Sequence, residues 1–551
     1  MHSEGGMDWT MGVGPHLQCQ PTGDADCLRD KSLNILNLPN ELLEDIFALL
    51  QDDQQSEAPY HFENSGRNRG DIKNVRLTCR RFCGTSSHLL MSHIAVDLTP
   101  AGLEHISAVS QHPTIFKGIR SVRVYVCFYS RRLATDLQHF ASVAAHRLLS
   151  RLEESERCRN EGQQGRVQRE HSTYLAKDVV AQAKKTVKIW TEFVHDQALG
   201  ETTQLPVVSS RNHPSVNDLL IVWEIYKRRQ LQQSQILQDG TFVHTIASAM
   251  ARLRKATRLE INDGDSGLRD QKESLTPLSA NNGPRKSFSG VIESMMLQPS
   301  KWVDARNEQL EAPPIEVLTA LPLALQEAGV ALTVLSINVT PSEDFDLKIR
   351  EADIDRLSFA ARKIQYFSFK TPAIGWHPTQ TPDEVSSFWT FLCIMMNPGE
   401  LRGLKLDLKF MEARNGASTS FGRLLLHPAS WPNLTTISLG SMSMRLSELE
   451  ELFLKTRSSG SHNSYASTVT EERRVQVSLK RIALLDGRWV DALHVLREHC
   501  GPGSQVLFPI LDTTFEGDYQ HAFYLQGYPP VKQNRATEYI QRRTDQNPLV
   551  N

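Results

Sequence analysis

Leu401-Arg402-Gly403-Leu404-Lys405-Leu406-Asp407-Leu408 alternates apolar and polar residues from Leu404 onward. This alternation predicts a short β-strand with one buried face, because successive strand side chains point to opposite sides of a sheet. Leu434-Thr435-Thr436-Ile437-Ser438-Leu439 has the same spacing of apolar residues. We expect the apolar side chains of both segments to face a core, and the intervening ones, such as Arg402, Lys405, Thr435 and Ser438, to face outward.

Six further segments alternate in the same way and predict strands. They cover residues 94–98, 119–126, 256–261, 332–339, 364–369 and 477–484. Helical periodicity precedes most of these strands, as at 316–328, 383–396 and 446–455, and a helix is also expected at 101–111. Strands that alternate with helices along the chain predict an α/β fold built from strand-helix units.

The spacing of Leu401, Leu404 and Leu406 resembles the L-x-x-L-x-L strand of leucine-rich repeats, in which a strand and its helix form one coil of a solenoid. The resemblance implies a leucine-rich-repeat-like solenoid over residues 94–510. Successive strand candidates lie at unequal distances along the chain, so the predicted array is irregular and degenerate. The βαβ units of an open sheet give a similar pattern and are the alternative interpretation.

The stretches between the strand candidates predict insertions and loops. Residues 131–254 are rich in helix formers with apolar spacing and predict a helical insertion that covers one face of the solenoid. Clusters of Gly, Ser, Asn and Pro predict flexible loops, which are either target-binding elements or idle insertions. These loops are expected at 263–289, 413–420 and 457–472, with a disordered leader at 1–30 and a tail at 511–551.

A different pattern occupies the N-terminal part of the chain. Leu38-Pro39-Asn40-Glu41-Leu42-Leu43-Glu44-Asp45-Ile46-Phe47 predicts a helix with Pro39 at its first position and Glu41 at its third, where a carboxylate can pair with the free N–H groups of the first turn. The apolar residues recur every three to four positions and form a stripe that requires burial. Most such stripes face the protein's own core, and the alternative is a partner protein.

The same segment, followed by Asp71-Ile72-Lys73-Asn74-Val75-Arg76-Leu77-Thr78-Cys79-Arg80-Arg81-Phe82, resembles an F-box. An F-box is a helical hook that docks a protein onto the Skp-type adaptor of a cullin-RING ubiquitin ligase. The chain is similar to fungal F-box proteins with poorly repeating solenoids, and the resemblance implies an F-box with its exit helix over residues 31–93. Two departures are the insertion at 51–70, which is longer than usual, and Phe82, where tryptophan is commoner.

The resemblance implies roles for individual residues. The residues expected to contact the adaptor are Leu38, Pro39, Leu42, Leu43 and Ile46. The residues expected to close the small helical domain are Val75, Leu77, Cys79 and Phe82. Burying a large apolar side chain contributes roughly 1.5–3 kcal/mol, so four or five anchors can hold a partner against the cost of association.

Composition limits the other function classes. The chain has 551 residues with 61 basic and 63 acidic side chains, so no overall field favours nucleic acid or an anionic membrane. Short basic runs such as 184–188 and 227–229 are expected to be solvated helix faces. The eight cysteines are scattered, which is typical of reduced thiols in the cytoplasm or nucleus. We expect no secretion signal and no membrane span.

Motifs for catalysis or metal binding are weak. Asp263-Gly264-Asp265-Ser266-Gly267 contains the Gly-Asp-Ser-Gly of trypsin-like proteases but lacks a matching histidine segment, so a hydrolase using Ser266 is a remote alternative. Cys79, Cys83, His88 and His93 offer four nominal metal ligands, although buried apolar cysteines are the better interpretation. No phosphate-binding glycine loop is present in the sequence. We therefore expect no catalytic residue, metal or cofactor.

These observations predict a non-catalytic substrate receptor. By resemblance, the F-box recruits the Skp-type adaptor and cullin, and the solenoid holds an unknown protein target for ubiquitination. The alternative from another class is an F-box scaffold that acts outside ubiquitination, as a structural or transcription-associated interaction protein. The identity of the target cannot be inferred from these residues.

Overall fold

The computed structural model describes residues 35–50, 69–163, 177–199, 214–264, 296–340, 347, 349–371, 382–408, 431–456, 474–507 and 534–550. Within these ranges, nine strands form one all-parallel sheet whose spatial order follows the chain order. The strands are β1 (His93–Asp97), β2 (Ser121–Tyr125), β3 (Arg258–Asn262), β4 (Val334–Asn338), β5 (Tyr366–Lys370), β6 (Gly403–Asp407), β7 (Thr436–Met444), β8 (Gln476–Leu484) and β9 (Gln505–Leu507). The sequential order excludes a doubly wound sheet for these strands, because that fold reverses its order at a switch point.

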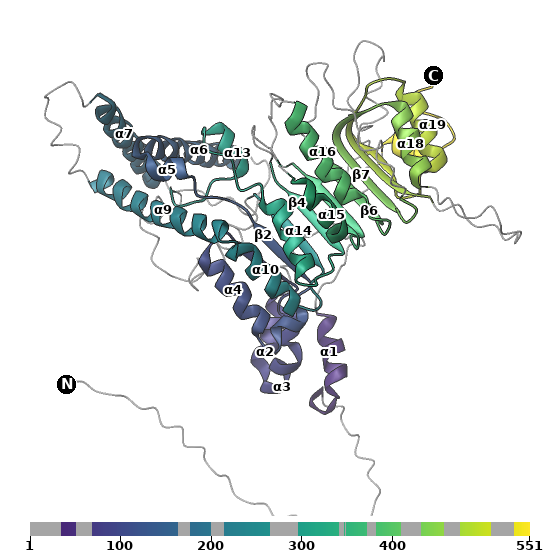
Figure 1. Ribbon diagram of the computed structural model, residues 1–551, viewed down its shortest axis with the longest axis horizontal. Coiled ribbons are helices and arrows are strands. Elements are labelled where there is room, and N and C mark those ends of the chain that lie inside the picture. The colour runs from purple at the N-terminus through teal and green to yellow at the C-terminus, as the bar shows by residue number, and fades with distance from the viewer. Residues whose placement is uncertain are drawn as a thin grey trace, which may run out of the picture.

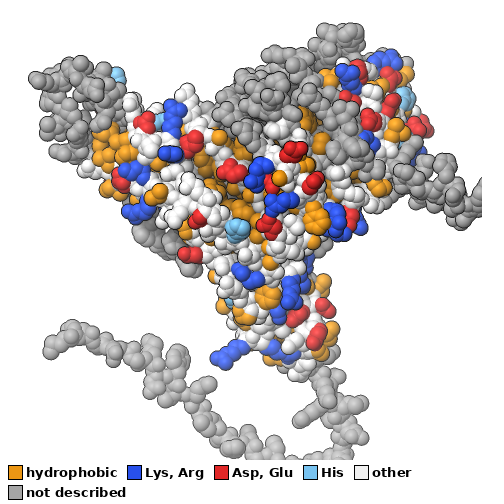
Figure 2. All heavy atoms as spheres, in the orientation of Figure 1, with side chains coloured by type: hydrophobic (Ala, Val, Ile, Leu, Met, Phe, Trp, Pro, Cys, Tyr) orange, Lys and Arg blue, Asp and Glu red, His pale blue; other side chains and the backbone are white. Residues whose placement is uncertain are grey.

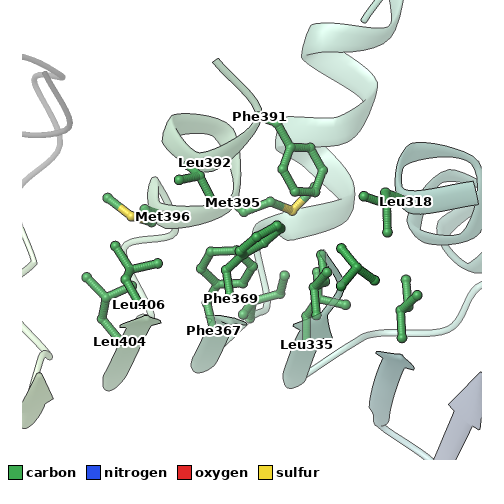
Figure 3. Packing of buried hydrophobic residues seen from close by; sticks show 14 of the residues in the cluster. Leu318, Leu335, Phe367, Phe369, Phe391, Leu392, Met395, Met396, Leu404 and Leu406 are labelled. Atoms are coloured by element: carbon green, nitrogen blue, oxygen red, sulfur yellow. The ribbon is translucent and has the colours of Figure 1, made fainter. Parts of the chain in front are cut away.

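The strands stay in register, so that equivalent apolar residues form continuous rows. Leu335 of β4 lies opposite Phe367 of β5, which lies opposite Leu404 of β6. Figure 3 shows these side chains pointing toward the helices, where Phe391 and Met395 pack against the row. All five residues are fully buried. The alternation at 401–408 thus places its leucines in the core, as predicted.

A layer of helices covers one face of the sheet (Figure 1). The helices are α4 (Pro100–Gln111), α10 (Thr241–Arg252), α14 (Val317–Glu327), α15 (Glu351–Ala361), α16 (Pro382–Met396), α18 (Leu446–Thr456) and α19 (Trp489–His499). From α4 to α16 each of them contacts the next, and α18 contacts α19. The strands and helices share one apolar core. The fold is therefore an α/β fold, consistent with leucine-rich-repeat-like strand-helix repeats.

The helical insertion between β2 and β3 is shorter than predicted. Its helices α5 (Arg131–Thr135), α6 (Leu137–Gln163), α7 (Lys177–Leu199) and α9 (Pro214–Gln238) enclose a second apolar core. By contrast α10, which the sequence assigned to the insertion, belongs to the repeat layer. Phe242, Ile246 and Met250 of α10 are buried in the solenoid core, because their spacing of four residues puts them on one helix face.

Buried hydrogen bonds join this helical arm to the solenoid. Tyr226 of α9 accepts a hydrogen bond from the backbone N–H of Ser130 at 2.8 Å. Gln233 accepts from the N–H of Tyr129 at 2.7 Å and donates to the carbonyl oxygen of Leu98 at 3.0 Å. Because unpaired buried polar groups are costly, these contacts fix the angle at which the arm leaves the solenoid.

The predicted tail contains a structured cap. Residues 534–550 include α21 (Arg535–Ile540), which packs on α19 and β9. Asn534 donates to the carbonyl oxygen of Val506 at 2.7 Å and caps α21 by accepting from the N–H of Thr537, also at 2.7 Å. These contacts give hydrogen-bond partners to backbone groups of the edge strand β9. The strand has only three residues, too few for a pattern to predict it from the sequence.

Two neighbouring strands share a backbone kink. Ser441 in β7 and Arg481 in β8 have φ values of 52° and 55°, an unusual region for residues other than glycine. The pairing resumes beyond both residues, with Met442 opposite Ile482. One extra residue in each strand returns these apolar side chains to the core side, where both are buried.

The predicted leader at 1–30 and the loops at 413–420 and 457–472 lie outside the described residues, as does the loop at 263–289 apart from Asp263 and Gly264.

Candidate functional site

The N-terminal helices form a small unit with its own core. The unit contains α1 (Asn40–Ala48), α2 (Arg69–Thr78), α3 (Arg80–Ser86) and the 3-10 helix η2 (Ser87–Leu89). Leu43 and Phe47 of α1 pack with Ile72 and Phe82, and the Phe47 and Phe82 rings meet edge to face at a centroid distance of 5.0 Å. Val75 and Cys79 are half-buried against this cluster.

Arg81 holds the entry to α1 against α3. Its guanidinium donates hydrogen bonds to the carbonyl oxygens of Leu36 and Leu38, and to the side-chain oxygen of Asn40 at 2.9 Å. The helix α1 begins at Asn40, one residue later than predicted. Pro39 therefore lies at the N-cap position and not at the first helical position, and Glu41 lies at the second helical position and not at the third. No local pattern in the sequence indicates this role of Arg81, because the segment that it contacts lies about forty residues away.

The outer face of α1 is apolar and exposed. Leu42, Ile46 and Leu49 are 48%, 37% and 84% exposed, and Ile35 and Leu36 in the preceding 3-10 turn η1 (Ile35–Asn37) are also exposed. Residues three and four apart share a helix face, so Leu42 and Ile46 of α1 and Leu49 at its C-cap form one stripe. Figure 2 shows hydrophobic side chains at the surface of the lower end of the molecule in this view, where Figure 1 places α1. Apolar patches of this kind mark interaction surfaces.

Two predicted site residues lie elsewhere than expected. Leu43, assigned to the adaptor-binding set, is fully buried in the unit's own core, because it shares a face with Phe47 rather than with Leu42. Leu77, assigned to the core, is 85% exposed, since it lies five residues after the buried Ile72 and points about 140° away from it around the helix. Leu38 is half-buried and Pro39 exposed.

The N-terminal unit joins the solenoid without a linker. β1 begins four residues after η2, and the carbonyl oxygen of Ser92 accepts a hydrogen bond from the N–H of Arg120 at 2.8 Å. A Cβ atom on Gly118 would lie 1.6 Å from the carbonyl oxygen of His88, so the two segments touch through a glycine. The apolar face of α1 is therefore held in a fixed orientation relative to the sheet.

The sheet face opposite the helix layer is polar. Its middle row contains Arg123 of β2 and Glu260 of β3, which lie opposite each other and form an ion pair at 2.7 Å. Both side chains are buried, and burial raises the pKa of Glu260 although Arg123 opposes the shift. Buried ion pairs contribute little net stability but are costly to break, so this pair fixes the packing of the face.

Asp263 directly follows β3 and is almost fully buried. Its carboxylate accepts a hydrogen bond from the backbone N–H of Thr340 at 2.8 Å, and its carbonyl oxygen accepts one from the Cys127 thiol at 3.3 Å. Burial raises the pKa of Asp263 to about 7, and the Thr340 hydrogen bond opposes the shift. The residue therefore joins three consecutive coils of the solenoid.

The remaining chemical candidates form no site in the described part of the chain. Cys79, Cys83, Cys127, Cys393 and Cys500 form no disulfide bonds there. The described part of the chain contains no group of three His, Cys, Asp or Glu side chains arranged to hold a metal. Ser266 lies outside the described ranges. Among the helices that the structure describes, none is long and apolar enough to cross a membrane.

Comparisons with protein-family models, with curated proteins and with solved structures gave no match to this chain.

Proposed function

We propose that the chain is the substrate-recognition subunit of an SCF-type (Skp-cullin-F-box) E3 ubiquitin ligase. In this proposal the N-terminal unit is an F-box that binds the Skp-type adaptor, and the solenoid binds the protein target. The subunit acts in the cytoplasm or nucleus, uses no cofactor and supplies no catalytic residue. Its contribution to rate is proximity, because it holds a target lysine near a charged conjugating enzyme on another subunit.

The observation that carries the proposal is the division of α1 into two apolar faces. One face holds the unit's own core through Leu43 and Phe47, and an adjacent face, about 110° around the helix, exposes Leu42, Ile46 and Leu49. A helix that served only its own core would bury one stripe and present polar residues elsewhere. The second stripe supports a docking role for the N-terminal unit.

Co-purification with a Skp-type adaptor tests the proposal. Leu42→Asp combined with Ile46→Asp places two charges on the exposed stripe, and we expect adaptor binding to be lost while the circular dichroism spectrum is unchanged. Leu231→Asp is the matched control, because Leu231 is 68% exposed on α9, far along the chain from the stripe. Equal binding by the wild type and the double variant would refute the docking role.

The alternative, an F-box scaffold that acts outside ubiquitination, predicts a different outcome for cullin recruitment after adaptor binding. A receptor should bring cullin and conjugating activity to a bound protein, whereas a scaffold outside ubiquitination should bind the adaptor without recruiting cullin. Reconstitution with purified adaptor and cullin-RING subunits separates the two alternatives.

A further inference from the structure

The polar face of the sheet divides into a closed half and an open half. In its middle row, Arg123, Glu260, Ser336 and Ser368 on β2 to β5 are each at most 8% exposed. The row then continues through half-buried and exposed positions on β6 to β9, which are Lys405, Ser438, Ser478 and Gln505. The part of the polar face that a ligand can reach therefore lies over β6 to β8 and the adjoining end of β5. We call this part the open half.

The open half carries an excess of positive charge. Lys370 at the end of β5 and Lys405 in β6 are half-buried, and Lys480 in β8 is exposed. All three project from the face opposite the helices, because they occupy outward positions of strands in register. Asp407 is the acidic residue among the outward positions of β5 to β8, whereas the whole chain has a net charge of −2.

Small residues form the floor between these lysines. Ser438 and Ser478 follow Lys405 in the middle row, and Gly440 lies beside Asp407. A Cβ atom on Gly440 would lie 2.9 Å from a carboxylate oxygen of Asp407, so the glycine leaves room for that side chain to lie flat. The side chains of these small residues therefore extend less far from the sheet than the lysine side chains around them.

An unsatisfied hydroxyl also lies on this face. Thr436 lies at an outward position of β7 in the open half, and its buried Oγ1 has no hydrogen-bond partner among the described residues. A buried carboxylate oxygen of Asp407 is also unpaired there. Buried polar atoms are rarely left unpaired in folded proteins, so these atoms point to a ligand or solvent whose donors complete their hydrogen bonds.

We infer that the open half of the polar sheet face, from Lys370 to Lys480, binds an extended acidic segment of a partner polypeptide. This inference rests on the proposed function and names the chemistry of its target. Three strand spacings of about 4.8 Å separate β5 from β8, which matches four to five residues of extended chain at about 3.3 Å each. Carboxylates of that segment pair with the lysines, and its main-chain groups meet the serine and threonine hydroxyls.

A polypeptide fits this face better than a nucleic acid. Single-stranded nucleic acids are held by stacking on aromatic side chains in addition to positive charge. Among the outward positions of β5 to β8, Tyr366 is the aromatic residue. The lysines therefore supply charge without a stacking platform.

Fluorescence anisotropy on the full-length chain tests the inference without the adaptor. The probes are a fluorescein-labelled dodecapeptide of alternating Glu and Ser, the same peptide with Gln for Glu, and a single-stranded DNA dodecamer. The test variant is Lys370→Glu, Lys405→Glu, Lys480→Glu. The control is Lys117→Glu, Lys185→Glu, Lys188→Glu, which changes the net charge equally at exposed positions elsewhere.

We expect the acidic peptide to bind the wild type and the control similarly, to bind the test variant at least tenfold more weakly, and to exceed the Gln peptide in affinity. Equal loss in both triple variants, no loss in the test variant, or tighter binding of DNA than of the acidic peptide would overturn the inference. Adaptor co-purification on the same preparations keeps the two proposals separate, because Lys370, Lys405 and Lys480 lie in the solenoid and not in the N-terminal unit.

Discussion

Replacing Asp263 with asparagine should change the pH dependence of folding. Burial raises the pKa of this carboxyl from 3.8 to about 7 in the folded protein. Between these values the folded state holds a proton that the unfolded state has released, so wild-type stability falls as pH rises from about 4 to 7 and then levels off. The asparagine of the Asp263→Asn variant has no such titration, and its side-chain oxygen can still accept the hydrogen bond from Thr340.

The size of the effect follows from the pKa difference. One pKa unit corresponds to about 1.4 kcal/mol, so the wild type should lose about 2–3 kcal/mol relative to Asp263→Asn between pH 5 and pH 8. The comparison cancels every other titration that the two chains share. Any constant cost of the asparagine N–H groups shifts the whole curve and leaves the slope difference unchanged.

Urea unfolding followed by tryptophan fluorescence, at pH values from 5 to 8, measures this difference. Asp239→Asn is the control, because Asp239 is exposed and hydrogen bonds from Thr241 lower its pKa, so it stays ionised over this range. Parallel stability curves for the wild type and Asp263→Asn would show that the buried carboxyl is ionised throughout, and would refute the reasoning.

Three further perturbations probe the packing. Leu43→Ala should destabilise the N-terminal unit by about 2–5 kcal/mol, whereas Leu42→Ala should change its stability by at most about 0.5 kcal/mol. Hydrogen exchange of the unit measures both changes. Similar values for the two variants would contradict the division of α1 into a core face and an exposed face. Glu260→Gln should destabilise the sheet more than the double change Arg123→Met, Glu260→Met, because the single change leaves a buried charge unpaired; thermal melting that ranks them the other way would count against the buried pair. Asn534→Ala should cost about 1–2 kcal/mol and speed proteolysis after β9, and unchanged cleavage would mean that the cap contributes nothing.

The repeat architecture could be predicted because each strand carries its own apolar alternation. Eight of the nine strands follow from segments such as 364–369 and 401–408, whose inward residues are large and buried. β9 has only three residues, too few for a period to appear. The role of α10 was missed because its apolar spacing resembles that of the insertion before it, and only its contacts with α4 and α14 reveal the repeat layer.

The candidate site was predictable in outline and not in detail. The apolar stripe after Pro39 indicated burial, but its division into a core face and an outer face depends on which residues Phe82 reaches. For the same reason Leu43 and Leu77 were assigned to the wrong faces. The ion pair of Arg123 with Glu260 joins strands that are separated by the whole helical arm, so no local pattern could indicate it.

Hydroxyl-radical footprinting of the full-length chain, with and without a purified Skp-type adaptor, tests the central proposal most directly. We expect the adaptor to protect Leu42, Ile46 and Leu49, and to leave Leu43 and Phe47 unchanged because they are already buried. Absence of binding, or binding that protects another surface while this stripe stays reactive, would contradict the proposal that the N-terminal unit is an F-box.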